Sequence, residues 1–373
     1  MVSRRFKSLL VAAFSLFSIL FSNVSYAGDW NPSSQILEHI GDAHEFHFFT
    51  LNKKPISIPL PVILYSKDAG WSVFMASRFE HGEQTYKGYR LLEESYITEN
   101  KLDPKIFKTG KIYAVDADGK PESYSIEKVY DLSLTRNAVQ VLISVLLLIW
   151  IMSSVAGKYA KGQGVKTAPT GFQNAVEPVI AFIRDDVGKT YLGDNYEKYM
   201  PLLLSIFFFI LINSLISLVP GTANVAGNIA FTGMLGIVAF FVIMFSTNKH
   251  YWLHIIWPPV PHGVKLIMWP VELLGIFTKP FALIIRLFAN MISGHVIILS
   301  FIILIFIFGA MNTALGWGTS PFFIALAVFI YLIEILVAFI QAYIFAALTA
   351  VFIGLASEGS HGHAEGHDDA VVI

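Results

Sequence analysis

Cysteine is absent from the 373 residues of this chain, and charged residues are scarce. Without a thiol, the chain has no disulfide, thiolate metal site or cysteine nucleophile. Charged residues make up 14% of it, whereas soluble domains carry about 25%. The net charge of −1 gives no basis for binding nucleic acid, and without a glycine-rich phosphate loop we expect neither a nucleotide site nor a cofactor. The 55% of hydrophobic residues are gathered in blocks, which predicts a protein that crosses a membrane several times.

The N-terminus has the features of a secretory signal. Basic residues at positions 4, 5 and 7 precede the apolar run Leu9–Phe21, and Ser25 and Ala27 occupy the small-residue positions of a cleavage site. We expect residues 1–27 to be a cleaved signal peptide, and the alternative is an uncleaved N-terminal anchor.

Residues 28–131 form a polar region without a run long enough to span a membrane. Ile56–Tyr65 and Lys111–Val115 are predicted as short strands, and Ala117–Lys120 as a turn, so we expect a small β-containing extension. A group of potential metal ligands has no recognisable ligand spacing, so we interpret it as solvated surface residues: His39, Asp42, His44, Glu45 and His47.

The rest of the chain, residues 132–357, is predicted to be an all-α transmembrane domain, followed by a tail at residues 358–373. Crossing the hydrocarbon core takes about 20 residues. Five apolar runs satisfy this length: Asn137–Ala156, Met200–Val219, Asn228–Ser246, Pro270–Gly309 and Pro321–Ala356. Gly171–Gly188 mixes apolar and charged residues and is predicted as an amphipathic helix at the membrane interface.

Charge predicts the orientation of these spans. The loops Pro220–Gly227 and Ala310–Ser320 contain no lysine or arginine, whereas the alternate loops are basic. Basic loops stay in the cytoplasm, which puts the N-terminal extension in the periplasm and the C-terminal tail in the cytoplasm. Five crossings after a cleaved signal give the same result. The tail histidines His361, His363 and His367 are interpreted as part of a solvated end.

The last two apolar runs are too long for simple spans. Pro270–Gly309 has 40 residues and Pro321–Ala356 has 36, and 40 helical residues extend about 60 Å against a core of about 30 Å. We expect two tilted helices, joined by a short turn at Met311–Ser320, that form a hairpin against a curved partner.

Arg286 is the residue least suited to its surroundings. It lies 16 residues from Pro270 and 23 from Gly309, too deep to reach either interface. An arginine at mid-membrane costs at least about 2.5–3.5 kcal/mol, and the guanidinium cannot deprotonate. Because no acidic residue lies nearby in the sequence, we expect an anionic partner elsewhere.

Helical geometry places polar residues around Arg286. Asn290, Ser293 and Glu272 fall within about 40° of it on the helix, and His295 lies about 180° away and about 13.5 Å towards the periplasm. On the last helix, Glu334 and Gln341 share a face. Setting Gln341 level with Arg286 brings Glu334 to the depth of His295. The ideal-helix angles argue against direct contact in either pair, so tilt, a bend or bridging water would have to reconcile them.

Residues Glu272–His295, read as ELLGIFTKPFALIIRLFANMISGH, resemble the signature of subunit a of F-type ATP synthases. Arg286 matches the essential arginine of that family, Asn290 the asparagine four residues on, and Gln341 its glutamine on the last helix. The likeness covers residues 131–357. Many bacterial members have an acid where this chain has His295 and a histidine where it has Glu334, so the two groups are exchanged.

The resemblance implies a proton-translocating subunit of the bacterial inner membrane, without a catalytic site of its own. Arg286 would face the carboxylates of a rotating ring of subunit c and separate two offset half-channels. His295 and Glu334, with Asn213 and Asn228 as further polar lining, would belong to the periplasmic half-channel, and Glu272 to the cytoplasmic one. Ser293 is a further candidate for channel lining. The other implied partners are subunit b of the peripheral stalk, the rest of the complex and membrane lipid.

Two other readings stay open at this stage. A self-contained ion-coupled secondary transporter or channel would use Arg286 to bind an anion, and it predicts internal repeats, which the sequence lacks. A membrane scaffold without transport activity would not retain a mid-membrane arginine together with polar groups at matching depths.

Overall fold

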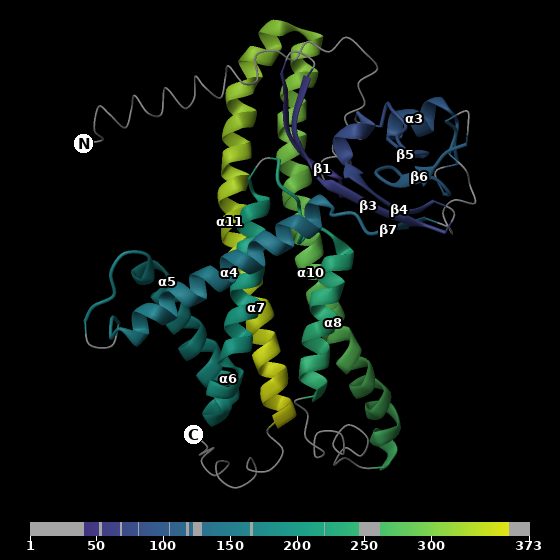
Figure 1. Cartoon of the computed structure of the whole chain (residues 1–373). Coiled ribbons are helices and arrows are strands. Elements are labelled where there is room, and N and C mark those ends of the chain that lie inside the picture. Colours follow the sequence, from purple (N-terminus) through teal and green to yellow (C-terminus); the bar gives the residue numbers. More distant parts are fainter. Residues whose placement is uncertain are drawn as a thin grey trace, which may run out of the picture. The chain divides into compact units, whose positions relative to one another are not determined.

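The computed structural model in Figure 1 describes residues 41–51, 54–67, 69–80, 82–103, 105–116, 119–121, 129–164, 167–219, 221–245 and 262–357. The chain divides into two compact units. Unit 1 holds residues 1–138, 220–223 and 296–330, and unit 2 holds residues 139–219, 224–295 and 331–373. Each unit is treated by itself. The predicted signal peptide and the C-terminal tail with its histidines lie outside the described residues.

Short antiparallel strands form the sheets of the N-terminal extension in unit 1. They pair as β1 with β2, as a three-stranded sheet in the order β4-β3-β7, and as β5 with β6. The strand bounds are β1 Glu45–Leu51, β2 Lys54–Pro59, β3 Pro61–Ser66, β4 Gly70–Met75, β5 Tyr89–Leu91, β6 Ile112–Ala114 and β7 Val129–Asp131. A 3-10 turn, η1 (Ala76–Phe79), and the short helix α3 (Glu94–Glu99) lie between them. The predicted β-containing extension is therefore confirmed.

One expected strand is in fact two. The segment Ile56–Tyr65 was predicted as a single strand, but it breaks at Leu60, where β2 ends and β3 begins. The break is necessary because β2 pairs with β1 while β3 pairs with β4 and β7 in a different sheet. The strand predicted at Lys111–Val115 is β6. A turn was expected at Ala117–Lys120. Gly119 donates its backbone N–H to the carbonyl oxygen of Asp116, as in a turn, while positions 117 and 118 lie outside the described residues.

The end of the extension is hydrogen-bonded to the first residues of helix α4 (Arg136–Ala160). The backbone N–H of Arg136 donates to Ala43 O over 2.8 Å, and that of Asn137 donates to the Asp42 carboxylate over 3.1 Å. The Arg136 guanidinium donates to Gly41 O. These bonds satisfy N–H groups that a helix start leaves unpaired. Residues of the extension therefore cap the first turn of α4.

Helices make up the remainder of the described chain. Their bounds are α4 Arg136–Ala160, α5 Phe172–Phe182, the π-helix η3 Ile183–Lys189, α6 Thr190–Leu192, the 3-10 turn η4 Gly193–Asn195, α7 Tyr196–Ser217, α8 Ile229–Phe245, α10 His262–Met311 and α11 Thr313–Ser357. Four helical segments are long and apolar enough to cross a membrane: residues 136–160, 172–217, 269–311 and 313–355. Helix α8, with 17 apolar residues, reaches the lower limit of about 17. The fold is that of a multi-span α-helical membrane protein.

The turn between the last two helices is shorter than the sequence indicates. Met311–Ser320 was predicted as the connection, but α10 continues to Met311 and α11 already begins at Thr313. Asn312 alone separates them, and its side-chain Oδ1 accepts the backbone N–H of Ala314 over 2.9 Å. A side-chain oxygen in this position starts a helix, so the glycines that follow are incorporated into α11.

The segment predicted as an interfacial helix is α5 together with η3. Helix α5 contains Pro178 and passes directly into the π-helix. Gly193, with a φ of 52° and ψ of −132°, then interrupts the helix before α7. This backbone conformation suits a residue without Cβ, and it gives α7 a start of its own.

Candidate functional site

His295 on α10 lies among oxygen acceptors in unit 2. Its Nε2 is 2.9 Å from the carbonyl oxygen of Ser217 at the end of α7. Its Nδ1 is 3.1 Å from the carbonyl oxygen of Met291, one helical turn earlier, and 3.1 Å from Oε1 of Glu334 on α11. Three helices therefore meet at one imidazole, and both ring nitrogens face oxygen atoms.

Glu334 is the buried partner of this imidazole. Its side chain is 3% exposed, while that of His295 is 20% exposed. The carboxylate reaches α10 at Gly294, where an added Cβ would lie 2.5 Å from Oε1 and 2.7 Å from Cδ of Glu334. Only a residue without a side chain leaves this space free, so Gly294 is a condition for the contact.

The two groups lie at ion-pair distance, 3.1 Å between Nδ1 and Oε1. A carbonyl oxygen only accepts hydrogen bonds, so Nε2 carries a hydrogen for Ser217 O. At Nδ1, a bare lone pair would face two oxygen atoms at 3.1 Å. A hydrogen on Nδ1 or on the Glu334 carboxyl group removes this repulsion. The imidazole and the carboxyl group, which can each bind a proton, therefore lie next to each other in the interior of the subunit.

Arg286 lies on the exposed side of α10. Leu283, Leu287 and Met291 on this helix are buried, whereas Arg286 is exposed. Among the side chains that the structure describes, Arg286 has no carboxylate within ion-pair distance. Three residues close to it on this face are small and also exposed: Ala282, Ala289 and Ser293. A cation surrounded by small residues is accessible to a partner helix.

The other predicted site residues are found in different environments. Gln341 on α11 is buried at 7% exposure, and Asn290 on α10 is partly buried. The Ser293 hydroxyl donates to Asn290 O over 3.1 Å. Glu272 belongs to α10, but its side chain lies outside the described part of the structure. Of the predicted site residues, the structure thus brings His295 and Glu334 into contact. Gln341 is also buried, but it is not part of this contact.

Sequence comparison identifies the helical part of the chain. Residues 138–354 match the family described as ATP synthase A chain. The subunit a of Chloroherpeton thalassium is 44% identical over 248 residues, which cover 64% of this chain and 72% of that protein. Subunit a 2 of Chlorobaculum tepidum is 42% identical over 243 residues, or 64% and 67% of the two chains. Subunit a of Myxococcus xanthus is 37% identical over 247 residues, or 64% and 78%.

The chain belongs to the ATP synthase subunit a family. The resemblance read from the sequence is thereby confirmed: the chain is a bacterial F-type ATP synthase subunit a, a multi-pass membrane protein that takes part in ion transport and ATP synthesis within that complex. The N-terminal region, residues 35–132, matches a different family, described only as a domain of unknown function.

In this subunit a, two predicted polar residues have structural partners. Asn213 on α7 is buried, accepts a hydrogen bond from Ser144 of α4 over 2.9 Å and donates to Phe209 O over 2.9 Å. Asn228 precedes α8, and its Oδ1 accepts the N–H of Ala230. Asn228 therefore caps a helix, which is a sufficient structural reason for an asparagine at that position.

Three polar residues with contacts to the predicted site residues or their neighbours were not singled out in the sequence. The Tyr331 hydroxyl donates to Leu218 O over 3.0 Å, and Asn224 Nδ2 donates to Met291 O over 3.3 Å. Ser144 holds Asn213, as described above. Tyr331 precedes Glu334 by three residues, about one helical turn, so helical spacing from Glu334 could have identified it. For Asn224 and Ser144 no such signal exists, because their partners are distant in sequence.

The extension of this subunit a presents no metal site in its described residues. Of the histidines considered, His44 is buried with Nε2 3.5 Å from Asp131 Oδ2, and no group of three potential ligands forms within the described part of the chain. Burial by itself would raise the pKa of Asp131, but the His44 imidazole and the hydroxyl and amide of Ser133 outweigh it and lower this pKa to about 2. The pair therefore stabilises the strand that leads into α4.

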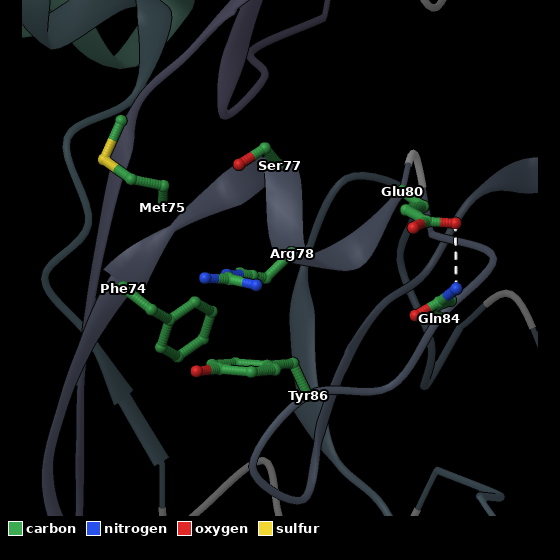
Figure 2. A pocket seen from close by; sticks show the side chains of 7 residues that line it. All are labelled: Phe74, Met75, Ser77, Arg78, Glu80, Gln84 and Tyr86. Atoms are coloured by element: carbon green, nitrogen blue, oxygen red, sulfur yellow. Dashed lines mark hydrogen bonds between the residues drawn. The ribbon is translucent and has the colours of Figure 1, made fainter.

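A shallow pocket on the extension has aromatic walls. In Figure 2 the Arg78 guanidinium lies over the ring of Tyr86, and Phe74 meets the same ring edge-on. Glu80 and Gln84 are joined by a hydrogen bond of 2.8 Å at the other side. The aromatic rings occupy the apolar part of this pocket themselves, and the arrangement is that of a packed surface.

Proposed function

We propose that this subunit a conducts protons through two offset half-channels that meet at Arg286, against a ring of subunit c. The observation that carries the proposal is the state of Arg286: it is exposed on a spanning helix, with no acidic partner among the described side chains. A permanent cation at this depth is costly without a counter-charge. The proposed counter-charge is the carboxylate of a ring subunit.

The physical role of Arg286 follows from its charge. A ring carboxylate can turn through lipid only in its protonated form, because a bare charge is too costly there. Beside a guanidinium, a carboxyl group within about 4–6 Å is favoured in its ionised form. A ring site that reaches Arg286 therefore releases its proton to one half-channel, and it reloads from the other after it leaves. The fixed cation also blocks direct proton leakage.

The small exposed residues near Arg286 support a close approach of the ring. Ala282, Ala289 and Ser293 lie on the same exposed face of α10. Small residues allow the backbones of membrane helices to come close together. A ring helix on this face could bring its carboxylate to the guanidinium, whereas large side chains would keep it at a distance.

The His295–Glu334 pair is proposed as the proton relay of the periplasmic half-channel. The distance of 3.1 Å between Nδ1 of His295 and Oε1 of Glu334 supports this role. The buried Asn213 next to Ser144 is assigned to the polar lining of the same half-channel. The exposed Ser293 is assigned to the ring-facing region, the buried Gln341 to the proton path inside the subunit, and Glu272 to the cytoplasmic half-channel. Asn228 caps helix α8, so its position is explained without a role in the channel lining.

The orientation proposed for the subunit follows from the charge of its loops. The extension at residues 28–131 would be periplasmic, the tail at residues 358–373 cytoplasmic, and the membrane the bacterial inner membrane, reached by a cleaved signal at residues 1–27. In the same proposal, α5 and η3 lie at the membrane interface. The subunit also contacts subunit b of the peripheral stalk.

The test is an Arg286→Ala variant in the assembled ATP synthase. We expect ATP-driven proton pumping into inverted vesicles to be abolished, because the ring carboxylate would lose the cation that favours its ionised form. Lys161→Ala is the matched control, since Lys161 is an exposed cation in the turn after α4, and it should pump at the level of the unmodified enzyme. ATPase activity that stays bound to the membranes shows that the complex assembles. Pumping by Arg286→Ala would contradict the proposal.

A further inference from the structure

The outer face of the three-stranded sheet in the extension is apolar and, among the described residues, largely exposed. Pleated strands direct alternate side chains to opposite faces. In β3 the buried residues are Val62, Leu64 and Ser66, so the other set points outwards, and β4 behaves in the same way. The outward set of the sheet contains no charged residue: Pro61, Ile63, Tyr65, Trp71, Val73, Met75 and Tyr130.

Three aromatic side chains cross this face from one edge strand to the other. Tyr65 on the central strand pairs with Trp71 of β4 and with Tyr130 of β7. Its ring centroid is 5.1 Å from that of Trp71 and 6.3 Å from that of Tyr130. Trp71 is 67% exposed, Val73 59% and Tyr130 53%. Large exposed apolar patches of this kind mark a binding surface.

The face continues towards the first membrane span. Leu132 follows Tyr130 by two residues, is exposed, and donates its N–H to Ile63 O over 2.9 Å, which extends the ladder of the sheet. Ser133 Oγ accepts the N–H of Ile63 over 3.1 Å. The spanning helix α4 begins at Arg136. Six residues reach at most about 22 Å, so Tyr130 lies within about that distance of the start of the span.

We propose that this aromatic face, residues 61, 63, 65, 71, 73, 75, 130 and 132, rests on the membrane at the boundary between lipid head groups and acyl chains. Three features favour lipid as the occupant. Tryptophan and tyrosine are the residues enriched at membrane–water interfaces. The face is attached to a membrane span by a hydrogen-bonded connection. An apolar surface without charge suits the acyl-chain boundary, where an unpaired charge is costly.

The tyrosine hydroxyls and the indole N–H give the face its polar rim. An aromatic side chain of this kind has an apolar body and a polar end, so it satisfies both sides of the interface. Lys67 is exposed in the turn between β3 and β4, so this end of the sheet also has a cation that can meet lipid phosphate. The extension would then lie on the lipid surface, independently of whether Arg286 has the role proposed above.

Spin labels can test this directly because the chain has no cysteine. Single-cysteine variants Val73→Cys and Tyr130→Cys place a nitroxide on the face, and Glu99→Cys places one on the exposed side of α3 as the matched control. The complete ATP synthase is reconstituted in phosphatidylcholine vesicles. Collision of each label with oxygen, which concentrates in lipid, is compared with collision with a water-soluble nickel chelate.

We expect the labels at positions 73 and 130 to have an oxygen-to-nickel ratio severalfold higher than the label at position 99. High nickel collision at both positions would show that the face is in water and would overturn the proposal. Low collision with both reagents would show that protein covers the face, and it would overturn the proposal equally. Two positions on different strands ensure that a local distortion at one label is recognised.

Discussion

At the scale of single residues, the contact between His295 and Glu334 depends on a neighbour without a side chain. Counting residues along two antiparallel helices put the two groups at one depth, but the ideal-helix angle argued against contact. The structure resolves this at Gly294, where the backbone of α10 leaves room for the carboxylate. Helical counting takes no account of the volume that a missing Cβ leaves, so the contact itself could not be predicted from the sequence.

Gly294→Ala is therefore expected to impair proton pumping. The added Cβ would lie 2.5 Å from Glu334 Oε1 and must displace the carboxylate from His295, at a cost of about 1–3 kcal/mol. Gly275→Ala on the same helix is the matched control, because nothing lies within 4 Å of its added Cβ. Pumping rates normalised to membrane-bound ATPase should fall severalfold for the first variant and stay unchanged for the second. Equal rates would show that the pair does not limit transport.

Asp131 offers a second prediction at this scale, in the extension. Its pKa is about 2 in the folded chain against an ordinary value of 3.8. The ionised carboxylate therefore stabilises the fold fully above pH 3.8, by about 2 kcal/mol. This stabilisation is lost as the pH falls towards 2. Amide hydrogen exchange in β3, corrected for the intrinsic pH dependence, should accelerate over this range, and Asp131→Asn should flatten the response. An unchanged response in Asp131→Asn would assign the acid sensitivity to other groups.

At the scale of elements, the apolar runs predicted the helices well and their ends poorly. The runs that begin at positions 137, 200, 270 and 321 each coincide with a helix, because a membrane span needs a continuous apolar sequence. The beginning of α11 was missed because Gly316, Gly318 and Ser320 resemble a loop, although Asn312 already caps the helix. The π-helix Ile183–Lys189 has no sequence pattern of its own, and only packing selects it.

The packing of α8 on α10 gives a prediction for these elements. A Cβ at Gly236 would lie 2.3 Å from Cγ1 and 2.6 Å from Cδ1 of Ile284. Gly236→Ala should therefore lower the stability of the subunit by about 1–3 kcal/mol, and Ile284→Ala in the same chain should restore part of it. Gly233→Ala on α8, with open space around its Cβ, is the control and should not destabilise. Thermal unfolding of the purified complex in detergent would measure the differences.

At the scale of the whole molecule, composition alone indicated a membrane protein, and a 24-residue segment indicated the family. The family match at residues 138–354 agrees with the segment Glu272–His295, whose apolar residues surround a single arginine. The extension was harder to interpret. Its polar sequence predicted a few strands, but the aromatic face arises from pairing strands that are far apart, since β7 joins β3 across more than sixty residues. Such long-range pairing has no local signal.

Because a single residue, Asn312, forms the turn between α10 and α11, the lengths of these two helices are constrained. Sixteen residues connect His295 to the turn on α10, and α11 then runs without interruption to Glu334. One residue added within either arm would shift every later side chain by about 1.5 Å and rotate it by about 100°, which would separate the imidazole from the carboxylate. Insertions and deletions in this hairpin are therefore tolerated only in pairs that cancel. Substitutions leave the alignment intact, so the hairpin can vary in composition while its length stays fixed.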